Sequence, residues 1–247
     1  MRWRFIPFEK YDPYVKTALN EVLIESVSKE QEGIFWLSGW NESCVNIGFG
    51  QNVLEVLDLK EIRKRNLKIV RRQGGGGAMY LDKNNEISWA MIFPEYHLKT
   101  KNPGLIYEMV CAMVVKTLKD LGIKSRHRPI NDVVTEKGKI SGSTLKKEGG
   151  ICYVGGTLLY DVDKVLLEKL LKPEKDTGKR QSVPEKEKRI TCVREESSVS
   201  FEEVLESLEK NFLEDKEYKS RGLSEEEFKK AEDLGEKYRS KEWIYQK

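Results

Sequence analysis

The stretch Arg71-Arg72-Gln73-Gly74-Gly75-Gly76-Gly77-Ala78-Met79-Tyr80 places two adjacent arginines directly before four consecutive glycines. It follows an apolar run, Leu67-Lys68-Ile69-Val70, that is typical of a strand. Glycine loses more backbone entropy on folding than any other residue, so four in a row need a reason. Without Cβ atoms, main-chain N–H groups can converge on an anion, and arginine adds a planar donor fork for phosphate or carboxylate. The stretch predicts an anion-binding loop; the alternative, a flexible linker, would not need arginines at its mouth.

Two familiar phosphate-binding loops do not match this stretch. The chain contains no G-x-x-x-x-G-K-[ST] pattern, which excludes a P-loop. The glycines do not read as G-x-G-x-x-G opening a helix, and Met79-Tyr80-Leu81 is typical of extended backbone, which disfavours a dinucleotide-binding Rossmann unit.

The composition bounds the class of protein. The chain has 247 residues, 38% of them hydrophobic and 34% charged, and its 44 Lys and Arg nearly balance 41 Asp and Glu. A formal charge of +3 does not indicate a dedicated nucleic-acid-binding protein. The abundance of Lys and Glu is typical of thermophile surfaces, so we expect a thermophilic source.

The cysteines and the amino terminus predict a cytoplasmic protein. The cysteines are widely spaced and form no zinc-binding pattern; they are Cys44, Cys111, Cys152 and Cys192. The amino terminus has no apolar targeting segment, and no run approaches membrane-spanning length. We therefore expect reduced thiols, with no membrane and no nucleic acid among the partners.

The periodicity predicts a single α/β domain over residues 1–247. Helices are expected at 13–27, with Asp12 as N-cap, and at 55–66, 102–121 and 161–171, while Ser200 and Ser224 open capping-box helices within 200–247. Strands are expected at 34–37, 44–47 and 87–93 and within 123–160. The polar segment 172–189 predicts a mobile loop that orders on ligand binding, or a solvated connector.

Lys139 is the second candidate site residue. In Lys139-Ile140-Ser141 a strand would set Lys139 and Ser141 on one face. Gly138 and Gly142 bracket the segment and would let a ligand approach the backbone. A lysine there can neutralise a phosphate and a carboxylate as they react. The alternative is a solvated surface lysine.

Asn131 and Asp132 offer an amide and a carboxylate in succession. Asp132 is a candidate Mg²⁺ ligand, because Mg²⁺ prefers carboxylate and phosphate oxygens; the alternative is a turn pair. Nucleophilic catalysis has little support, because His97 and His127 lie in no recognisable motif. The cysteines are more typical of small buried hydrophobic residues.

Taken in order, a set of motifs resembles that of the lipoate–protein ligase family. The motifs are Tyr11-Asp12-Pro13-Tyr14 with Leu19-Asn20-Glu21, Ile47-Gly48 with Gln51-Asn52, Arg71 to Ala78 as R-R-x-x-G-G-G-A, Asn131-Asp132, Lys139-Ile140-Ser141-Gly142-Ser143 as K-[IV]-S-G-S, and Gly156-Thr157-Leu158-Leu159. Each motif alone is weak, but the ordered set is specific.

The resemblance implies a fold and a two-step reaction. The fold is the catalytic domain shared by biotin and lipoate ligases and related to class II aminoacyl-tRNA synthetases, with a mixed or antiparallel sheet flanked by helices. Lipoate would attack the α-phosphate of ATP, with Mg²⁺, and the lipoyl-adenylate would acylate a lysine of a lipoyl-domain protein. That acceptor would be a glycine cleavage H protein or a 2-oxoacid dehydrogenase E2.

The resemblance also implies the site. Lys139 would be catalytic and touch both phosphate and acyl carbonyl. The expected ATP and lipoyl-adenylate contacts are Arg71, Arg72, Gly75, Gly76, Gly77, Ala78, Met79, Tyr80, Asn131, Asp132, Lys139, Ser141, Gly156 and Thr157. Longer bacterial ligases carry a C-terminal accessory domain for which this chain has no room, so a separate small accessory subunit is expected to assist adenylation.

Two departures from the family pattern keep alternatives open. Leu81 and Gly155 stand where the family often has histidines. One alternative is an octanoyl or lipoyl transferase of the same fold, which works through a cysteine thioester; residues 126–134 contain no cysteine, which argues against it. The other is a non-catalytic acyl- or nucleotide-binding relative.

Overall fold

The fold is built on two sheets, seen in a computed structural model that describes residues 1–172 and 189–246. The strands are β1 (Trp3–Tyr11), β2 (Gly33–Trp40), β3 (Cys44–Ile47), β4 (Lys68–Arg71), β5 (Met79–Leu81), β6 (Glu86–Pro94), β7 (Arg126–Arg128), β8 (Asp132–Val134), β9 (Lys139–Glu148), β10 (Ile151–Leu159) and β11 (Tyr218–Ser220). Within the described residues the large sheet has eight strands in the order β11-β1-β2-β6-β10-β9-β8-β7. In the large sheet, β1 pairs in parallel with β11 and β2, and the other described pairings are antiparallel.

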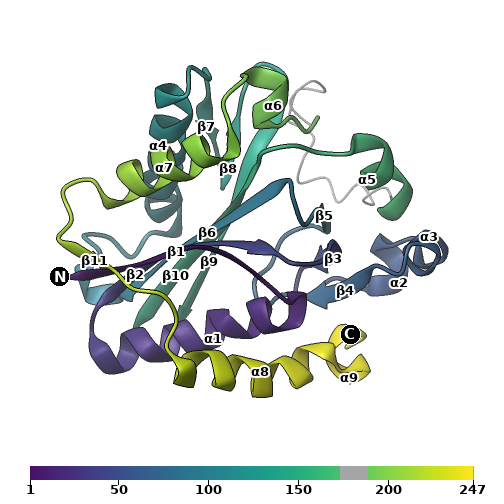
Figure 1. The fold of residues 1–247 in the computed structure, drawn as a ribbon, viewed down its shortest axis with the longest axis horizontal. Helices are drawn as coiled ribbons and strands as arrows, with labels where there is room; N and C mark the ends of the chain where they lie inside the picture. Colours follow the sequence, from purple (N-terminus) through teal and green to yellow (C-terminus); the bar gives the residue numbers. More distant parts are fainter. Residues whose placement is uncertain (173–188, 247) are drawn as a thin grey trace.

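Helices cover both faces of the large sheet (Figure 1). They are α1 (Pro13–Glu30), α2 (Val53–Val56), α3 (Leu59–Lys64), the 3-10 turn η1 (Glu95–His97), α4 (Pro103–Asp120), α5 (Lys164–Leu170), α6 (Val193–Glu196), α7 (Phe201–Leu213), α8 (Glu225–Arg239) and α9 (Lys241–Ile244). The pair α1 and α8 lies on one face, and α4 and α7 lie on the other. Each face therefore has its own buried core, around Leu19 and Tyr238 on the first and around Val114 and Phe212 on the second.

The helix starts follow from local chemistry, as the sequence predicts. The Asp12 carboxylate accepts hydrogen bonds from the N–H groups of Tyr14 and Val15, and Pro13 occupies the first turn of α1. Ser200 and Ser224 both form complete capping boxes. The predicted α/β class, with a mixed sheet flanked by helices, is confirmed. In the described part of the chain, no helix is both long and apolar enough to cross a bilayer.

The small sheet, ordered β4-β3-β5, positions the glycine-rich stretch. Its central strand β3 runs parallel to β4 and antiparallel to β5. The connection from β4 to β5 must therefore cross over the end of β3, next to Gly48. We call this connection, residues 72–78, the glycine loop.

Some elements differ from the sequence prediction. Strands β1 and β11 were not expected, and the single helix expected at 55–66 is divided into α2 and α3 around Leu57, which is extended and bridges to Leu171. The Asp58 carboxylate then caps α3. Residues 173–188 of the predicted mobile loop lie outside the described residues.

A buried ion pair ties the first strand to α8. The Arg4 guanidinium, 2% exposed, donates to both Glu227 carboxylate oxygens at 2.7 Å. Its other donors reach the Arg221 and Gly222 carbonyls. Burial alone would raise the pKa of Glu227, but hydrogen bonds from Arg4, the Ser224 N–H and Ser26 bring that pKa down to about 2. The pair therefore stabilises the folded state only while Glu227 is ionised.

This depressed pKa predicts acid sensitivity. A carboxyl whose folded pKa is about 2, against an ordinary 4.5, stabilises the fold above pH 4.5 and loses that contribution as the pH falls toward 2. We expect Glu227 to contribute about 3 kcal/mol to the pH dependence of the unfolding free energy. Urea unfolding from pH 6 to pH 2.5 should show a steeper fall for the wild type than for Glu227→Gln. Parallel curves for the two proteins would contradict the assignment.

Candidate functional site

The glycine loop packs against two other parts of the chain. A Cβ on Gly48 would overlap the Gly76 carbonyl, and the Phe49 N–H donates to the Gly74 carbonyl at 3.0 Å. On the other side, a Cβ on Gly74 would lie 2.7 Å from the Thr144 hydroxyl of β9. The consecutive glycines therefore serve close backbone approach, as expected for a built loop rather than for a linker.

Arg72 organises the loop from within. Its guanidinium donates to the carbonyls of Gly75 (2.8 and 3.1 Å) and Gly77 (2.9 Å) and to the Asn46 amide oxygen (2.9 Å). Burial lowers the pKa of Arg72 to about 10, which leaves it cationic at neutral pH. In a trans peptide the N–H points opposite to the C=O. The N–H groups of Gly76 and Ala78 therefore point away from the Arg72 guanidinium. They are candidate hydrogen-bond donors to an anion.

Arg71 has a different place from its neighbour. Its side chain is fully buried, and its guanidinium donates to the carbonyls of Gly48, Phe49 and Gln51 and to two carbonyls of α9. The direct ligand contact expected for Arg71 is not available to a side chain with no exposed surface. We therefore revise its role to that of a positioning residue.

Lys139, the first residue of β9, lies beside Asp132. Its Nζ is 2.5 Å from the Asp132 Oδ1, and its side chain is 29% exposed. A Cβ on Gly142 would come within 2.7 Å of the lysine Cε and Nζ, so Gly142 makes room for the lysine itself. Similarly, a Cβ on Gly138 would meet the Arg189 carbonyl at 2.5 Å. The sequence suggested that both glycines make room for a ligand. In the structure Gly142 makes room for the Lys139 side chain and Gly138 for the Arg189 carbonyl.

The expectation that Lys139 and Ser141 share a face is wrong. The pairing of β8 with β9 shifts register at this point, with Val133 opposite Ser141 and Val134 opposite Lys139. This bulge reverses the alternation. Ser141 is buried opposite Leu158 and Val133, both in the core beneath α4 and α7.

Gly156 also faces that core rather than the glycine loop. A Cβ on this residue would overlap the Trp89 ring. The missing side chain of Gly156 therefore leaves room for the Trp89 ring beneath α4 and α7. The ligand contact expected for Gly156 could involve only its main chain.

Lys139 and the glycine loop lie on the same face of β9. The Lys139 ammonium lies over Gly142, and the glycine loop touches Thr144, two residues further along the same face. Residues i and i+2 of a strand are ~7 Å apart. Thr157, opposite Gly142 on β10, has a buried hydroxyl without a hydrogen-bond partner in the described structure. A buried polar group of this kind calls for a partner, and a bound ligand would supply one.

The space at Gly155, where the family often has histidine, is filled by Tyr153. A Cβ on Gly155 would overlap the Tyr153 hydroxyl. That hydroxyl donates to the Asn20 side chain of α1 at 3.0 Å. Burial raises the pKa of Tyr153 well above its usual range. Sequence reasoning missed the site-face residues Tyr153 and Thr144, because only strand pairing reveals them. Asn20 of α1 stands in the first motif, but it received no site role there.

The remaining predicted contacts occupy the end of the loop and the β7–β8 turn. Ala78 and Met79 pack on the core beneath α1. Tyr80 is buried, and its hydroxyl donates to Asp82 at 3.0 Å, while burial raises its pKa to about 12. Asn131 donates from its side chain to the Ser143 carbonyl. The side chains of these four residues therefore contact other parts of the protein. A ligand contact by any of them would involve its main-chain groups.

The Asp132 carboxylate is paired with two cations in this structure. Its Oδ2 accepts from Arg128 at 2.7 Å, and its Oδ1 faces Lys139. Burial raises the pKa of Asp132, but the two cations more than compensate and hold it below its usual value. In the described part of the chain, no three His, Cys, Asp or Glu side chains are grouped to hold a metal. Asp132 therefore orients Arg128 and Lys139 here, and its Mg²⁺ role stays a prediction.

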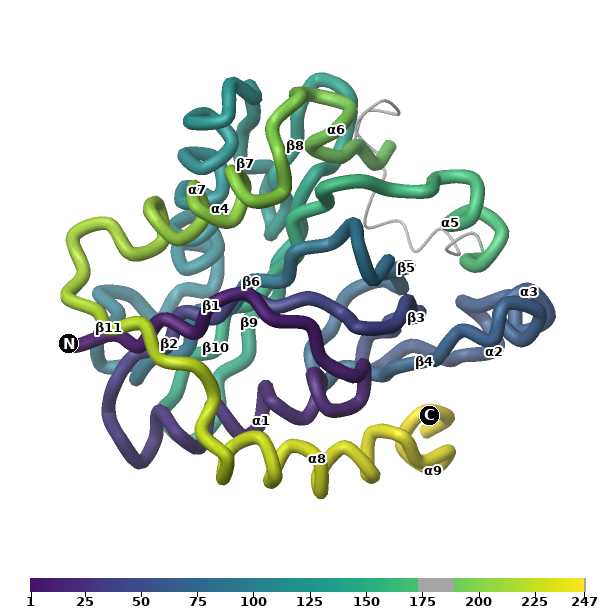
Figure 2. Tube along the Cα trace, viewed as in Figure 1, coloured from purple at the N-terminus to yellow at the C-terminus, as the bar shows by residue number. Residues whose placement is uncertain are grey.

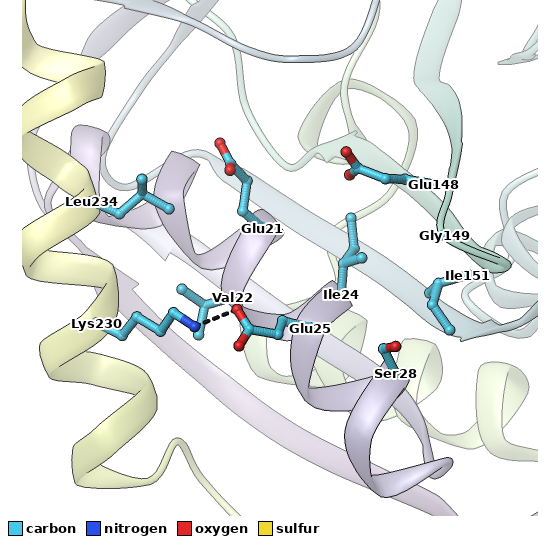
Figure 3. A pocket seen from close by; sticks show the side chains of 10 residues that line it. All are labelled: Glu21, Val22, Ile24, Glu25, Ser28, Glu148, Gly149, Ile151, Lys230 and Leu234. Atoms are coloured by element: carbon cyan, nitrogen blue, oxygen red, sulfur yellow. Dashed lines mark hydrogen bonds and ion pairs between the residues drawn. The ribbon is translucent and has the colours of Figure 1, made fainter.

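A groove of about 420 Å³ lies elsewhere, between α1, α8 and the β9–β10 turn (Figure 3). Glu21, Glu25 and Glu148 line it together with Lys230, which pairs with Glu25. Lys139 and the glycines of the loop are not among its lining residues. We therefore do not assign it to the chemistry of the site.

Comparison with known proteins identifies the family and the fold. The family model described as the lipoyl protein ligase A/B catalytic domain matches residues 12–213. The octanoyltransferase LipM of Staphylococcus aureus is 26% identical, over 99% of this chain and 99% of its own length. A lipoate–protein ligase A bound with ATP superposes with a TM-score of 0.85 at 22% identity, covering 99% of each chain.

A second solved structure has the same fold. It is the bipartite lipoate protein ligase of Thermoplasma acidophilum, described with its E2 lipoyl domain, with a TM-score of 0.84 at 22% identity. The alignment covers 98% of this chain and 95% of the other. The fold and the site define an enzyme of the lipoate ligase and transferase class. This chain belongs to the lipoyl protein ligase A/B catalytic domain family.

Proposed function

We propose that the protein is an ATP-dependent lipoate–protein ligase. The proposal is carried by a single observation: the Lys139 ammonium lies over Gly142 and the glycine loop contacts Thr144, two residues further along the same face of β9. Two anions that must react need cations and main-chain donors to offset their repulsion. A lipoate ligase joins a carboxylate to a phosphate, which is the chemistry that such a face suits.

The two steps balance as follows. A lipoate carboxylate oxygen forms a bond to the α-phosphorus of ATP, and the bond to the pyrophosphate oxygen breaks. The amine of an acceptor lysine then attacks the acyl carbonyl, loses a proton, and AMP leaves. The N–H groups of Gly76 and Ala78 donate hydrogen bonds to the phosphate oxygens. The Lys139 ammonium neutralises the charge of the phosphate and carboxylate oxygens. Mg²⁺ would accompany ATP, because it binds phosphate oxygens.

Other groups extend the proposed site toward the rest of the nucleotide and the acyl group. The Thr157 hydroxyl donates to a ligand oxygen. Within the described residues strand β5 is at the edge of the small sheet, so the main-chain groups on its outer side are available for the edge of a purine. The proposed acceptor is a lipoyl-domain protein, and the bipartite Thermoplasma relative supports testing a small accessory subunit.

The similarity to LipM favours the octanoyltransferase alternative. That mechanism needs an exposed cysteine thiol as the nucleophile, and the cysteines of this chain do not supply one. The chain contains four cysteines, and all are buried. Burial raises the thiol pKa of Cys111 to about 11 and of Cys152 to about 12, and it raises those of Cys44 and Cys192 as well. A thioester mechanism needs an accessible thiolate.

This burial predicts resistance to alkylation. We expect the native protein, incubated with iodoacetamide at pH 7.5, to stay unlabelled by intact mass and to keep its ligation rate within twofold, because none of its thiols is accessible. The urea-unfolded protein is the control and should take up four labels, one for each cysteine. Rapid single labelling with loss of transfer would support the transferase instead.

A direct assay tests the function. The protein is mixed with ATP, Mg²⁺, lipoate and a lipoyl-domain acceptor, with and without a candidate accessory subunit, and the acceptor mass is measured. We expect a lipoyl mass increase that requires ATP. Transfer from octanoyl-acyl carrier protein without ATP would favour the transferase, and no product under either condition would favour a non-catalytic relative.

A further inference from the structure

The C-terminal segment reaches the start of the glycine loop, although more than 150 residues separate them in sequence (Figure 2). We call residues 238–244 the tail segment; it includes α9, which lies against β4. The Trp243 indole N–H donates to the Arg71 carbonyl at 2.9 Å. In return, the Arg71 guanidinium donates to the carbonyls of Trp243 (3.1 Å) and Ile244 (2.6 and 3.0 Å). Arg71 is thus bound to the tail through both its main chain and its side chain.

A second, separate contact holds Gln73, on the other side of Arg72. Its side-chain amide donates to the Tyr238 hydroxyl at 2.7 Å and also to Glu21 of α1. Tyr238 is fully buried, and its hydroxyl donates to the same Glu21. Lys146 of β9 donates to the side-chain amide oxygen of Gln73. The tail segment therefore fixes the residues immediately before and after Arg72.

Aromatic packing adds a third contact. The Trp243 ring lies 5.1 Å from the Tyr238 ring and 5.9 Å from the Phe49 ring, measured between centroids. The main-chain N–H of Phe49 itself donates to the Gly74 carbonyl. Trp243 therefore reaches the glycine loop from both the Arg71 side and the Phe49 side.

We propose that Trp243 and Tyr238 are positioning residues for the glycine loop and preorganise it for the nucleotide. The proposal rests on the proposed function, because the ligand is the phosphate of ATP. Gly75 is exposed and has no packing neighbour to hold it, since a Cβ on this residue would meet nothing within 4 Å. A glycine-rich segment pays a large entropic cost to hold one conformation. Fixing both neighbours of Arg72 lets that side chain hold the Gly75 and Gly77 carbonyls before ATP arrives.

The test compares Trp243→Phe with Tyr245→Phe in the full chain. The first change removes the indole donor and keeps an aromatic ring. The second alters an aromatic residue of the same terminus that is 44% exposed. Loss of one hydrogen bond predicts amide hydrogen exchange in residues 72–80 about three- to tenfold faster in Trp243→Phe. The control should match the wild type.

Steady-state ligation kinetics provide the second readout. We expect Trp243→Phe to raise the KM for ATP about fivefold, while kcat and the KM for lipoate stay within twofold. A purely structural role would instead lower the melting temperature and affect both substrates alike, which would overturn the proposal. Unchanged loop exchange in Trp243→Phe would also overturn it. If the wild type does not use ATP, the proposed function fails, but hydrogen exchange still decides whether the tail orders the loop.

Discussion

Replacing Lys139 by alanine is expected to lower the rate of lipoyl-adenylate formation by about 100- to 1,000-fold. The ammonium is the cation on the face of β9 between Asp132 and the glycine loop. Removing one preorganised group that meets developing charge typically costs a reaction this much. Lipoate-dependent exchange of labelled pyrophosphate into ATP measures the step directly, without an acceptor protein.

The matched control is Lys137→Ala, two residues before the strand. That side chain is 54% exposed and pairs with Glu196 rather than with Asp132. We expect its exchange rate to stay within twofold of the wild type. A wild-type rate in Lys139→Ala, with the accessory subunit present, would remove Lys139 from the chemistry and leave it as a partner of Asp132.

The second large effect is expected on stability. We expect Glu227→Ala to lower the unfolding free energy by about 3–5 kcal/mol, because it leaves the buried Arg4 guanidinium without its carboxylate. Glu236→Ala on the same helix is the matched control; Glu236 is 70% exposed and lies 3.7 Å from Arg239. Exposed pairs of that kind contribute about 0–1 kcal/mol. Urea unfolding at pH 7 measures both variants.

Glu227 also completes the Ser224 capping box, so two further variants separate the contributions. Ser224→Ala should cost about 1 kcal/mol, which is the typical value of a cap. Adding Arg4→Met to Glu227→Ala should recover part of the loss, because the unpaired buried charge disappears with the arginine. A cost for Glu227→Ala no larger than that for Ser224→Ala would mean that the ion pair contributes little.

Much of the fold could be predicted because the signals are local. The caps at Asp12, Ser200 and Ser224 and the apolar stripe of α4 are each visible within one window of sequence. Strand β1 gives no such signal. Its residues show no regular alternation, Pro7 interrupts it, and its parallel partners, β2 and β11, come from other parts of the chain.

The candidate site was predicted in its residues more than in its geometry. Arg71 and Arg72 look equivalent in sequence, yet Arg71 ends β4 and points into the protein, whereas Arg72 begins the loop. One bulged residue in β9 separates Lys139 from Ser141. Neither a buried arginine that binds carbonyls nor a bulge leaves a reliable mark on a single sequence. The cytoplasmic location, the thermophilic source and the accessory subunit stay predictions.

The most direct test is a crystal structure of the protein with a non-hydrolysable lipoyl-adenylate analogue. The account predicts that the adenylate phosphate oxygens accept hydrogen bonds from the Gly76 and Ala78 N–H groups and lie within contact of Lys139 Nζ. An analogue bound in the groove between α1 and α8, or a phosphate remote from both the loop and Lys139, would contradict it.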